Sequence, residues 1–356
     1  MHVCSTMEAN LSALWPTPAS SLMSPKAKGD ISKVIDMVQV VFYSMVFLIG
    51  SLGNGVVIAI TARQASHNVN CVFFLNLALA DFLFSVSRIV PLMKNAFYGG
   101  DWPFGSFLCK ANSFTKYLNM FCSVFLLAAI SLDRMASVAY PVWSRNNRGP
   151  RLAWMAAFGA WLVATAASLP FYFYRTVVFD SKRNETKCSL TLGDGESVKL
   201  ILYLLRLVCG FLAPFVIIVA CYGVIAMTLR QRQVTIRSKK PFKVILVIVI
   251  TFFLCWAPYH LFLLLKLKGY KGQAVSIGLP LTSCLAYFNS CANPILYFFM
   301  GLDFRREINR FNLTRALRRA LLEGTVYSLG ELSGRKKETP SSVDEPGCST
   351  VTQGVV

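Results

Sequence analysis

The chain has 356 residues, of which 55% are hydrophobic and only 15% are charged, and its mean hydropathy is +0.52. This balance excludes an ordinary soluble domain and indicates a polytopic membrane protein. The formal net charge of +19 is compatible with nucleic-acid binding. However, the basic bias of membrane-protein loops and contact with anionic lipid account for most of these residues, so no nucleic-acid partner is expected.

Seven stretches of the chain are long and apolar enough to cross a lipid bilayer, which requires about 20 residues in a helix. They cover residues 37–62, 70–95, 107–139, 152–173, 198–229, 242–266 and 274–299. The segment before them lacks the charged and apolar regions of a secretory signal peptide, so the first span is expected to act as its own insertion signal. The predicted fold is an all-α membrane protein, a bundle of seven transmembrane helices over residues 37–300, preceded by an extracellular tail at 1–36.

Basic residues in the short connections predict the orientation of the spans. The connections after spans five and three contain Arg230, Arg232, Arg237, Lys239, Lys240 and Lys243, and Arg145, Arg148 and Arg151, respectively. These loops are therefore predicted to be cytoplasmic, which places the N-terminus outside the plasma membrane and the C-terminus inside. The glycosylation sequons at Asn10 and Asn184 then lie outside, whereas the sequon at Asn312 lies inside.

Two of the eleven cysteines differ from the others in position. Cys109 lies at the outer end of span three and Cys188 lies in the loop after span four, so both are at the oxidising face of the membrane. A disulfide between them is expected. Most of the others lie within spans, where a thiol behaves as a small apolar group.

Several polar side chains stand inside apolar spans, where they must be satisfied by one another. They are Asn54 in span one, Asp81 in span two, Asn119 and Ser123 in span three, and Asn289 and Asn293 in span seven. Such groups can simply hold helices together. A carboxylate among neutral oxygens, however, indicates a cation site or a proton-linked switch at Asp81.

The cytoplasmic end of span three carries the adjacent residues Asp133 and Arg134. Taken alone, they could form an ordinary ion pair at the membrane interface. Spans five and six each contain a proline that interrupts the helical hydrogen-bond ladder, Pro214 before Tyr222 and Pro258 in span six. This setting favours a functional role for the pair.

These features together resemble the rhodopsin-like (class A) G-protein-coupled receptors. The motifs "GNGVVI", "LALAD", "SLDRM", "CWAPY" and "NPILY" stand in order, with Trp161 in span four and Pro214 and Tyr222 in span five. The resemblance covers all seven spans. It implies a plasma-membrane receptor that couples a ligand to a heterotrimeric G protein.

The resemblance also implies roles for individual residues. The switch residues are Asp133, Arg134, Tyr222, Trp256, Pro258, Asn293 and Tyr297. Arg134 would leave its tether and meet the C-terminal helix of the G protein, Tyr222 and Tyr297 would support that open state, and Trp256 would sense the ligand. An allosteric sodium ion, with no other cofactor, would be held by Asp81, Asn119, Ser123, Asn289 and Asn293.

Met135 stands where the family usually has tyrosine. The alternative function is therefore an atypical or decoy receptor that works with arrestin but gives little G-protein signalling.

Longer segments are similar to the chemoattractant branch of the family. "PVWSRNNR", "RLVCGFLAPF", "ITFFLCWAPYH" and "IGLPLTSCLAYFNSCANPILYFFMGLDF" most resemble chemerin receptors, and related segments occur in formyl-peptide, complement anaphylatoxin and chemoattractant-type prostaglandin receptors. This branch implies chemotaxis and inflammatory signalling through an inhibitory-class G protein. Arg88 and Pro91 in span two depart from the pattern of the branch.

Basic residues in the outer halves of the spans indicate the chemistry of the ligand. Arg206 lies eight residues beyond Val198, which is ~12 Å into the bundle, and Lys116 lies at a similar depth in span three. Snorkelling to the headgroups is the simpler alternative for both side chains. With Arg175 in the second outer loop, they predict an anionic ligand, either a peptide with a free carboxylate or a lipid acid. The predicted aromatic walls of this site are Tyr117, Tyr259 and Tyr287.

Other classes of protein lack their characteristic residues here. An amine receptor needs an acid where Lys116 stands, and an opsin needs a lysine in span seven. A transporter usually shows paired repeats with broken helices, and no internal similarity is visible. None of the three histidines belongs to a catalytic or metal-ligand set, so neither an enzyme nor a metal site is expected.

After span seven, residues 301–323 place apolar side chains near one helical face and arginines on the other, which predicts an amphipathic interfacial eighth helix on the inner leaflet. Residues 324–356 are polar and predict a disordered cytoplasmic tail. Receptor kinases and arrestin are its expected partners. The candidate phosphorylation sites are Thr339, Ser341, Ser342, Ser349, Thr350 and Thr352.

Overall fold

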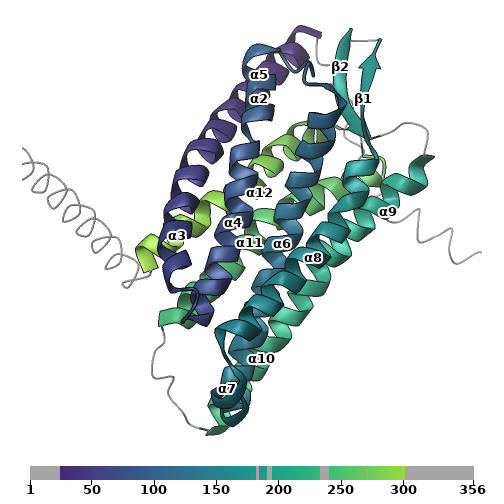
Figure 1. Cartoon of the computed structure of the whole chain (residues 1–356). Helices are drawn as coiled ribbons and strands as arrows, with labels where there is room; N and C mark the ends of the chain where they lie inside the picture. Colours follow the sequence, from purple (N-terminus) through teal and green to yellow (C-terminus); the bar gives the residue numbers. More distant parts are fainter. Residues whose placement is uncertain (1–24, 182–183, 191–194, 233–239, 271, 301–356) are drawn as a thin grey trace, which may run out of the picture. The chain divides into compact units, whose positions relative to one another are not determined.

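The computed structural model describes residues 25–181, 184–190, 195–232, 240–270 and 272–300. Within these ranges, seven helices are long and apolar enough to cross a membrane, and Figure 1 shows them side by side. They are Asp30–Gln64, Val69–Phe97, Gly105–Ala139, Pro150–Phe173, Ser197–Gln231, Lys243–Leu267 and Gln273–Phe298. The predicted seven-helix bundle is confirmed, and each span overlaps the stretch expected from the sequence. The predicted interfacial helix at 301–323, the tail at 324–356 and the sequon at Asn10 lie outside the described residues.

Three of the seven spans consist of more than one helical segment. The helices are α2 (Pro25–Met45), the π-helix η1 (Val46–Gly50), α3 (Ser51–Gln64), α4 (Val69–Ser87), α5 (Ile89–Phe97), α6 (Gly105–Ala139), α7 (Pro141–Asn147), α8 (Pro150–Phe173), α9 (Gly195–Leu207), the π-helix η3 (Val208–Leu212), α10 (Ala213–Arg232), α11 (Lys240–Leu267) and α12 (Gln273–Met300). Spans one, two and five are the composite ones. The strands β1 (Arg175–Asp180) and β2 (Glu185–Leu190) follow span four.

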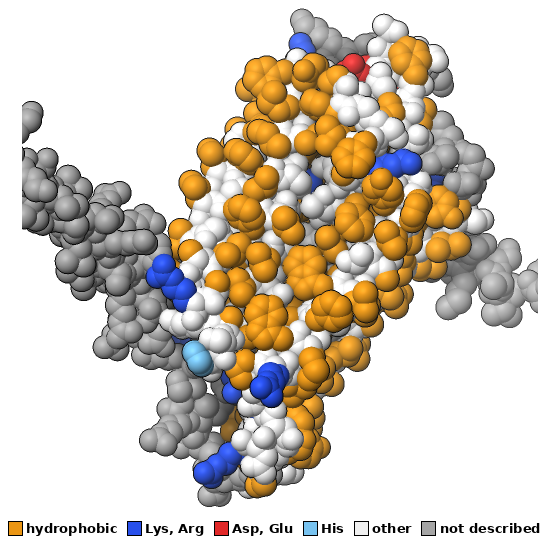
Figure 2. All heavy atoms as spheres, viewed as in Figure 1, with side chains coloured by type: hydrophobic (Ala, Val, Ile, Leu, Met, Phe, Trp, Pro, Cys, Tyr) orange, Lys and Arg blue, Asp and Glu red, His pale blue; other side chains and the backbone are white. Residues whose placement is uncertain are grey.

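The outer surface of the bundle is apolar. Large hydrophobic side chains are exposed on several spans, among them Leu52 at 71%, Phe158 at 70% and Leu254 at 66%. Figure 2 shows hydrophobic side chains across one face, with lysine and arginine gathered toward its ends. Such a surface suits the hydrocarbon of a bilayer, where backbone polar groups must be satisfied within the helices themselves.

Span three, formed by α6, is the central helix of the bundle. It packs against α4, α8, α10 and α11, and it also contacts β1. Polar groups on α6 must therefore be satisfied by neighbouring helices rather than by lipid or bulk water. A hydrogen bond between polar side chains also joins span four to span two: the Nε1 of Trp161 donates to the Oδ1 of Asn76 over 2.9 Å.

Prolines account for two irregular segments. Pro91 has no backbone N–H to donate to the carbonyl of Ser87, and the helix of span two is interrupted at Arg88, between α4 and α5. Pro214 likewise cannot donate to the carbonyl of Gly210, and the chain widens into the π-helix η3 just before it. Arg88 and Pro91, which depart from the sequence pattern of the chemoattractant branch, therefore coincide with a break in the helix of span two.

The loop after span four contains a β-hairpin, which is an addition to the expected all-α fold. Strands β1 and β2 are antiparallel, with Arg175 opposite Leu190 and Asp180 opposite Glu185. The Nζ of Lys187 lies 2.8 Å from the carboxylate of Asp180 and 3.4 Å from that of Glu185. The acids of the hairpin are therefore paired within the hairpin.

The contact between spans one and two leaves no room for a side chain at Gly50. A Cβ built on Gly50 would lie 2.9 Å from the Cβ of Ser85 and closer still to its Oγ. We predict that Gly50→Ala lowers the free energy of unfolding by about 1–3 kcal/mol, because the added methyl group overpacks this contact. Thermal unfolding of the detergent-purified protein measures the effect.

Gly159→Ala in α8 is the matched control, because no atom of the described residues lies within 4 Å of a Cβ built on Gly159. The control should leave stability unchanged or raise it, since alanine is the better helix former. Combining Gly50→Ala with Ser85→Gly should restore stability. A Gly50→Ala protein as stable as the parent would contradict the close approach.

Candidate functional site

A cavity of about 500 Å³ lies among α6, α8, α9 and α11, beside the β-hairpin. Its basic lining residues are Lys116, Arg175, Lys199, Arg206 and Lys266. No acidic side chain belongs to its described lining, and none of these five cations forms a salt bridge within the described ranges. The cavity therefore carries a positive potential, which favours an anionic occupant.

Arg206 is held deep in the cavity by tyrosines. The residue is 7% exposed, and its Nη1 donates hydrogen bonds to the hydroxyl oxygens of Tyr117 and Tyr259, both at 2.9 Å. Its guanidinium carbon lies 5.7 Å from the centre of the Tyr203 ring. Its Nε is buried without a hydrogen-bond partner among the described residues. A buried guanidinium with only neutral partners is poorly compensated, so this position is suited to receive an anion.

The ammonium of Lys116 is surrounded by three aromatic rings. Its Nζ lies 5.5 Å, 5.0 Å and 5.1 Å from the ring centres of Tyr117, Tyr259 and Tyr287, respectively. Cation–π contacts stabilise a cation without neutralising it. Lys116 and Arg206 share two of these tyrosines, so two positive charges converge on one place. This is not the geometry of side chains that snorkel to lipid headgroups.

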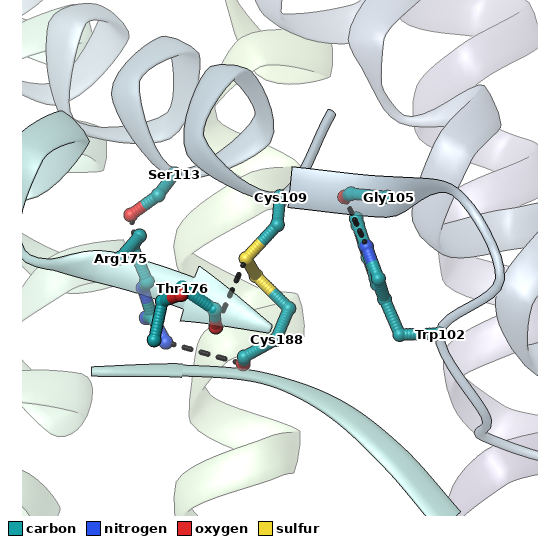
Figure 3. Close-up of a disulfide and its surroundings, with 7 residues drawn as sticks. All are labelled: Trp102, Gly105, Cys109, Ser113, Arg175, Thr176 and Cys188. Atoms are coloured by element: carbon teal, nitrogen blue, oxygen red, sulfur yellow. Dashed lines mark hydrogen bonds between the residues drawn. A yellow bond between two sulfur atoms is a disulfide. The ribbon is translucent and has the colours of Figure 1, made fainter. Parts of the chain in front are cut away.

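A disulfide between Cys109 and Cys188 joins the hairpin to the start of α6, with the two Cα atoms 5.5 Å apart, and it confirms the predicted bridge. Arg175 on β1 is fixed beside it (Figure 3). Its Nε donates to the Oγ of Ser113 at 3.1 Å, and its Nη1 donates to the carbonyl oxygen of Cys188 at 3.3 Å. The hairpin thus adds an oriented cation to the cavity.

Five of the six predicted ligand-binding residues line the cavity, and Tyr287 does not. Its ring lies behind the cavity, with its centre 5.1 Å from the Nζ of Lys116 and 5.4 Å from the guanidinium carbon of Arg88. Arg88 is 2% exposed, and its Nη2 donates to the Oδ1 of Asn112 at 2.9 Å. The sequence marks Arg88 as unusual, but its partners on other spans, Asn112 and Tyr287, are not evident from the sequence.

Lys199, Lys266 and Tyr203 also line the cavity and were not expected there. Lysines near span ends often contact lipid headgroups, so their charge alone was not informative. Spacing offered a signal, because Lys199 stands seven residues before Arg206 and Lys266 stands seven residues after Tyr259. An interval of two turns places the members of each pair on one helical face.

A second polar cluster connects spans one, two, three and seven. The carboxylate of Asp81 accepts hydrogen bonds from the Nδ2 of Asn119 at 2.8 Å and the Nδ2 of Asn293 at 2.7 Å. The Oγ of Ser290, which was not predicted, donates to Asn119 at 3.3 Å. The Nδ2 of Asn54 donates to the backbone carbonyl of Ser290 at 2.9 Å. The structure thus brings Asp81, Asn119 and Asn293 together, as the sequence suggested.

Several oxygens on these spans are buried and lack a hydrogen-bond partner in the part of the chain that the structure describes. They include the Oγ of Ser123 and the Oδ1 atoms of Asn289 and Asn293. A carboxylate with neutral oxygen donors is the ligand set that hard cations take, so these residues fit the predicted sodium ion. No hydrogen bond joins Ser123 or Asn289 to Asp81 among the described contacts, and the ion itself stays a prediction.

At the other end of span three, Asp133 is shared by two arginines. Its Oδ2 lies 2.7 Å from the Nη2 of Arg134, and its Oδ1 lies 2.8 Å from the Nε of Arg148. The Oδ1 of Asn70 accepts hydrogen bonds from both arginines. The sequence identified Arg148 only as a loop cation. The short helix α7 returns the chain toward α6 and thereby makes it a partner of Asp133.

Trp256 lies on α11 next to Tyr259, which lines the cavity. Its ring centre lies 5.9 Å from that of Tyr259, whose hydroxyl accepts from Arg206, and 6.3 Å from that of His260. Both nitrogens of His260 are buried without a hydrogen-bond partner among the described residues. A displacement of Tyr259 would therefore reach Trp256 by direct packing.

The remaining switch residues are spread over three spans. Pro258 lies inside α11, and the hydroxyl of Tyr222 on α10 is buried without a hydrogen-bond partner among the described residues. The ring of Tyr297 on α12 lies 4.9 Å from that of Phe74. Their joint action stays a prediction.

Residues 53–297 match the family model for the 7 transmembrane receptor (rhodopsin family). The matched range runs from span one into span seven and contains the cavity, the Asp81 cluster and the Asp133 pair. The chain belongs to the rhodopsin family of seven-transmembrane receptors. The receptor is therefore a multi-pass plasma-membrane protein with a ligand and a G protein as partners, and it is not an enzyme.

Three relatives place the receptor among the chemoattractant types. It is 42% identical over 314 residues to chemerin-like receptor 1 of Homo sapiens, covering 83% of this chain and 83% of that protein. Identity to the fMet-Leu-Phe receptor of Pongo pygmaeus is 37% over 312 residues, covering 83% and 89%. Identity to the C3a anaphylatoxin chemotactic receptor of Danio rerio is 39% over 303 residues, covering 83% and 81%. The branch indicated by the sequence segments is thus confirmed.

Proposed function

We propose that the receptor binds an extracellular ligand through an anionic group and activates a heterotrimeric G protein of the inhibitory class. The proposal depends above all on Arg206, whose buried guanidinium is bonded to two neutral hydroxyls and to no acid among the described residues. A ligand carboxylate can bind such a group in bidentate fashion. The names of the relatives refer to chemerin, fMet-Leu-Phe and the C3a anaphylatoxin, which supports a peptide ligand. A peptide with a free carboxylate and a lipid acid offer the same chemistry to Arg206.

The proposed orientation places the cavity outside the cell and Asp133 inside. The disulfide beside the cavity supports this orientation, because disulfides persist in oxidising compartments. Asn184 is exposed in the turn of the hairpin with a φ of 53°, so its sequon is accessible for glycosylation on the same side. The N-terminus is then extracellular and the C-terminus cytoplasmic.

The proposed signal passes from the cavity along span six to Arg134. Tyr259 contacts both Arg206 and Trp256, so a ligand bound to Arg206 would move the ring beside Trp256. Release of Arg134 from Asp133 would then free it for the G protein. Receptor kinases and arrestin are the proposed partners of residues 324–356, which lie outside the described residues.

Met135 favours a second candidate function, an atypical or decoy receptor that binds the same ligands with arrestin but gives little G-protein signalling. It occupies the position after Arg134 at which the family usually has tyrosine. The ion pair between Asp133 and Arg134, at 2.7 Å, forms in spite of this change, which supports G-protein coupling. Nucleotide exchange by a purified G protein distinguishes the two functions.

An allosteric sodium ion is proposed at Asp81. The residues that would hold it are Asp81, Asn119, Ser123, Asn289 and Asn293, whose buried oxygens fit a hard cation. When bound, the ion supplies the positive charge that the carboxylate otherwise lacks. Asn119 and Asn293 orient that carboxylate by hydrogen bonds to its two oxygens.

Arg206→Ala is predicted to weaken the binding of an anionic agonist by about 30-fold or more, because removing one member of a buried charge pair costs about 2–5 kcal/mol. Arg206→Lys keeps the charge but loses the bidentate geometry, so its effect should be intermediate. An agonist is first identified by screening chemoattractant peptides and anionic lipids for suppression of cAMP in cells that express the receptor. Competition binding then measures its affinity.

The agonist's own methyl ester or amide is the control on the ligand, and Lys268→Ala, which changes a cation outside the cavity lining, is the control on the protein. Lys268→Ala should bind like the parent. If the ester binds the parent as tightly as the free acid does, no carboxylate is recognised at Arg206.

Arg134→Ala is predicted to abolish activation of the G protein while ligand binding stays close to that of the parent. Arg134 lies far along α6 from the cavity and contacts Asp133 and Asn70 instead of cavity residues. Arg145→Ala, an exposed cation on α7, is the matched control and should activate normally. Ligand-stimulated nucleotide exchange with purified components measures both, and unchanged exchange by Arg134→Ala would refute the switch.

Sodium is predicted to lower agonist affinity in the parent and to have no such effect in Asp81→Asn. An ion that prefers the inactive state shifts the population away from the state that binds agonist best, and the amide removes the charge that holds the ion. Agonist binding is measured across a sodium titration, with potassium replacing sodium at constant ionic strength. Equal agonist affinity of the parent at every sodium concentration would exclude the ion.

A further inference from the structure

The cavity holds more positive charge than a single ligand carboxylate can balance. Its described lining includes five basic residues and no acid, and the nearby hairpin acids Asp180 and Glu185 pair with Lys187 instead. A carboxylate bound at Arg206 would leave the other cations unmatched. Several like charges around one cavity raise the local positive potential, so an occupant with a second anionic group is favoured.

Four of the five cations of the cavity form two tiers. The inner tier is Arg206 and Lys116, which lie among the buried tyrosines. The outer tier is Lys199 and Lys266, whose side chains are exposed at the mouth. Lys199 is seven residues from Arg206 on span five, and Lys266 is seven residues from Tyr259 on span six. Each interval corresponds to about 10 Å along a helix. Lys199 and Lys266 therefore lie at a similar distance from the inner tier, one on each helix.

We propose, as an extension of the proposed function on which it rests, that the ligand is an acidic peptide that binds both tiers. Its terminal carboxylate binds the inner tier, and an acidic side chain binds Lys199 and Lys266. An extended chain advances about 3.3 Å per residue, so a separation of about 10 Å places this side chain three residues before the C-terminus. An acyl chain fits less well, because nine of the fourteen lining residues are charged or carry a hydroxyl group.

The test uses synthetic tetrapeptides and the purified full-length chain. Asp-Ala-Ala-Phe with a free C-terminus carries two carboxylates at the proposed spacing, and Asn-Ala-Ala-Phe carries only the terminal one. Apparent affinity is obtained from the rise in the midpoint of thermal unfolding with peptide concentration. The parent should bind the Asp peptide roughly three- to ten-fold more tightly than the Asn peptide, as expected for partly exposed ion pairs.

The double variant Lys199→Gln with Lys266→Gln should lose this preference for the Asp peptide. Lys268→Gln is the matched control, because it removes the same charge from the same end of span six without changing the cavity lining, and it should keep the preference. Three results would overturn the proposal: equal binding of the two peptides to the parent, no stabilisation by the Asp peptide at millimolar concentration, or an undiminished preference in the double variant.

Two further ligands separate this proposal from the proposed function. If Asn-Ala-Ala-Phe binds more tightly than its C-terminal amide while the Asp peptide gains nothing, the inner site stands and the second tier fails. If acid and amide bind alike, carboxylate recognition at Arg206 fails as well. Stronger stabilisation by dodecanoic acid than by either peptide would replace the acidic peptide with a lipid acid.

Discussion

Hydrocarbon solvates neither peptide groups nor charges, and this constraint determines where the polar groups of the receptor lie. Seven helices of the described residues are long and apolar enough to cross a membrane, and many of the buried polar side chains belong to clusters around Arg206, Asp81 and Asp133. The carboxylate of Asp133 is matched by two arginines, whereas that of Asp81 is bound by neutral amide groups. The cavity around Arg206 is not matched, because the described lining holds cations without acids. That imbalance is the physical basis for proposing an anionic ligand.

Tyrosines are well suited to hold such an unmatched arginine. The hydroxyls of Tyr117 and Tyr259 fix the guanidinium of Arg206 at 2.9 Å each and leave its charge in place. An aspartate in the same position would neutralise the arginine, and a ligand carboxylate would then have to displace it. Arg175 is oriented in the same manner by the hydroxyl of Ser113 and a backbone carbonyl. Preorganised cations of this kind reduce the ordering that a ligand must impose when it binds.

Local breaks in the helices contribute to this arrangement. Pro214 and the π-helix η3 stand just after Arg206 in span five, and Pro91 accompanies the interruption of span two at Arg88. The disulfide between Cys109 and Cys188 holds the hairpin against α6, so Arg175 reaches the cavity from outside the helical bundle. Regular helices alone would not supply a cation from that direction.

The sequence by itself determined the seven spans, the disulfide and most of the inner site, because each depends on a local property. A run of apolar residues is sufficient to specify a span, and an arginine or lysine inside such a run is costly wherever it points. Only the tertiary structure decided which distant residues meet: Arg148 with Asp133, Asn112 with Arg88, Ser290 with Asn119, and Lys199 and Lys266 with one cavity. It also placed Tyr287 behind the cavity rather than in its lining. These pairings depend on how helices far apart in the chain rotate and pack against one another, and no periodicity within a single span encodes that rotation.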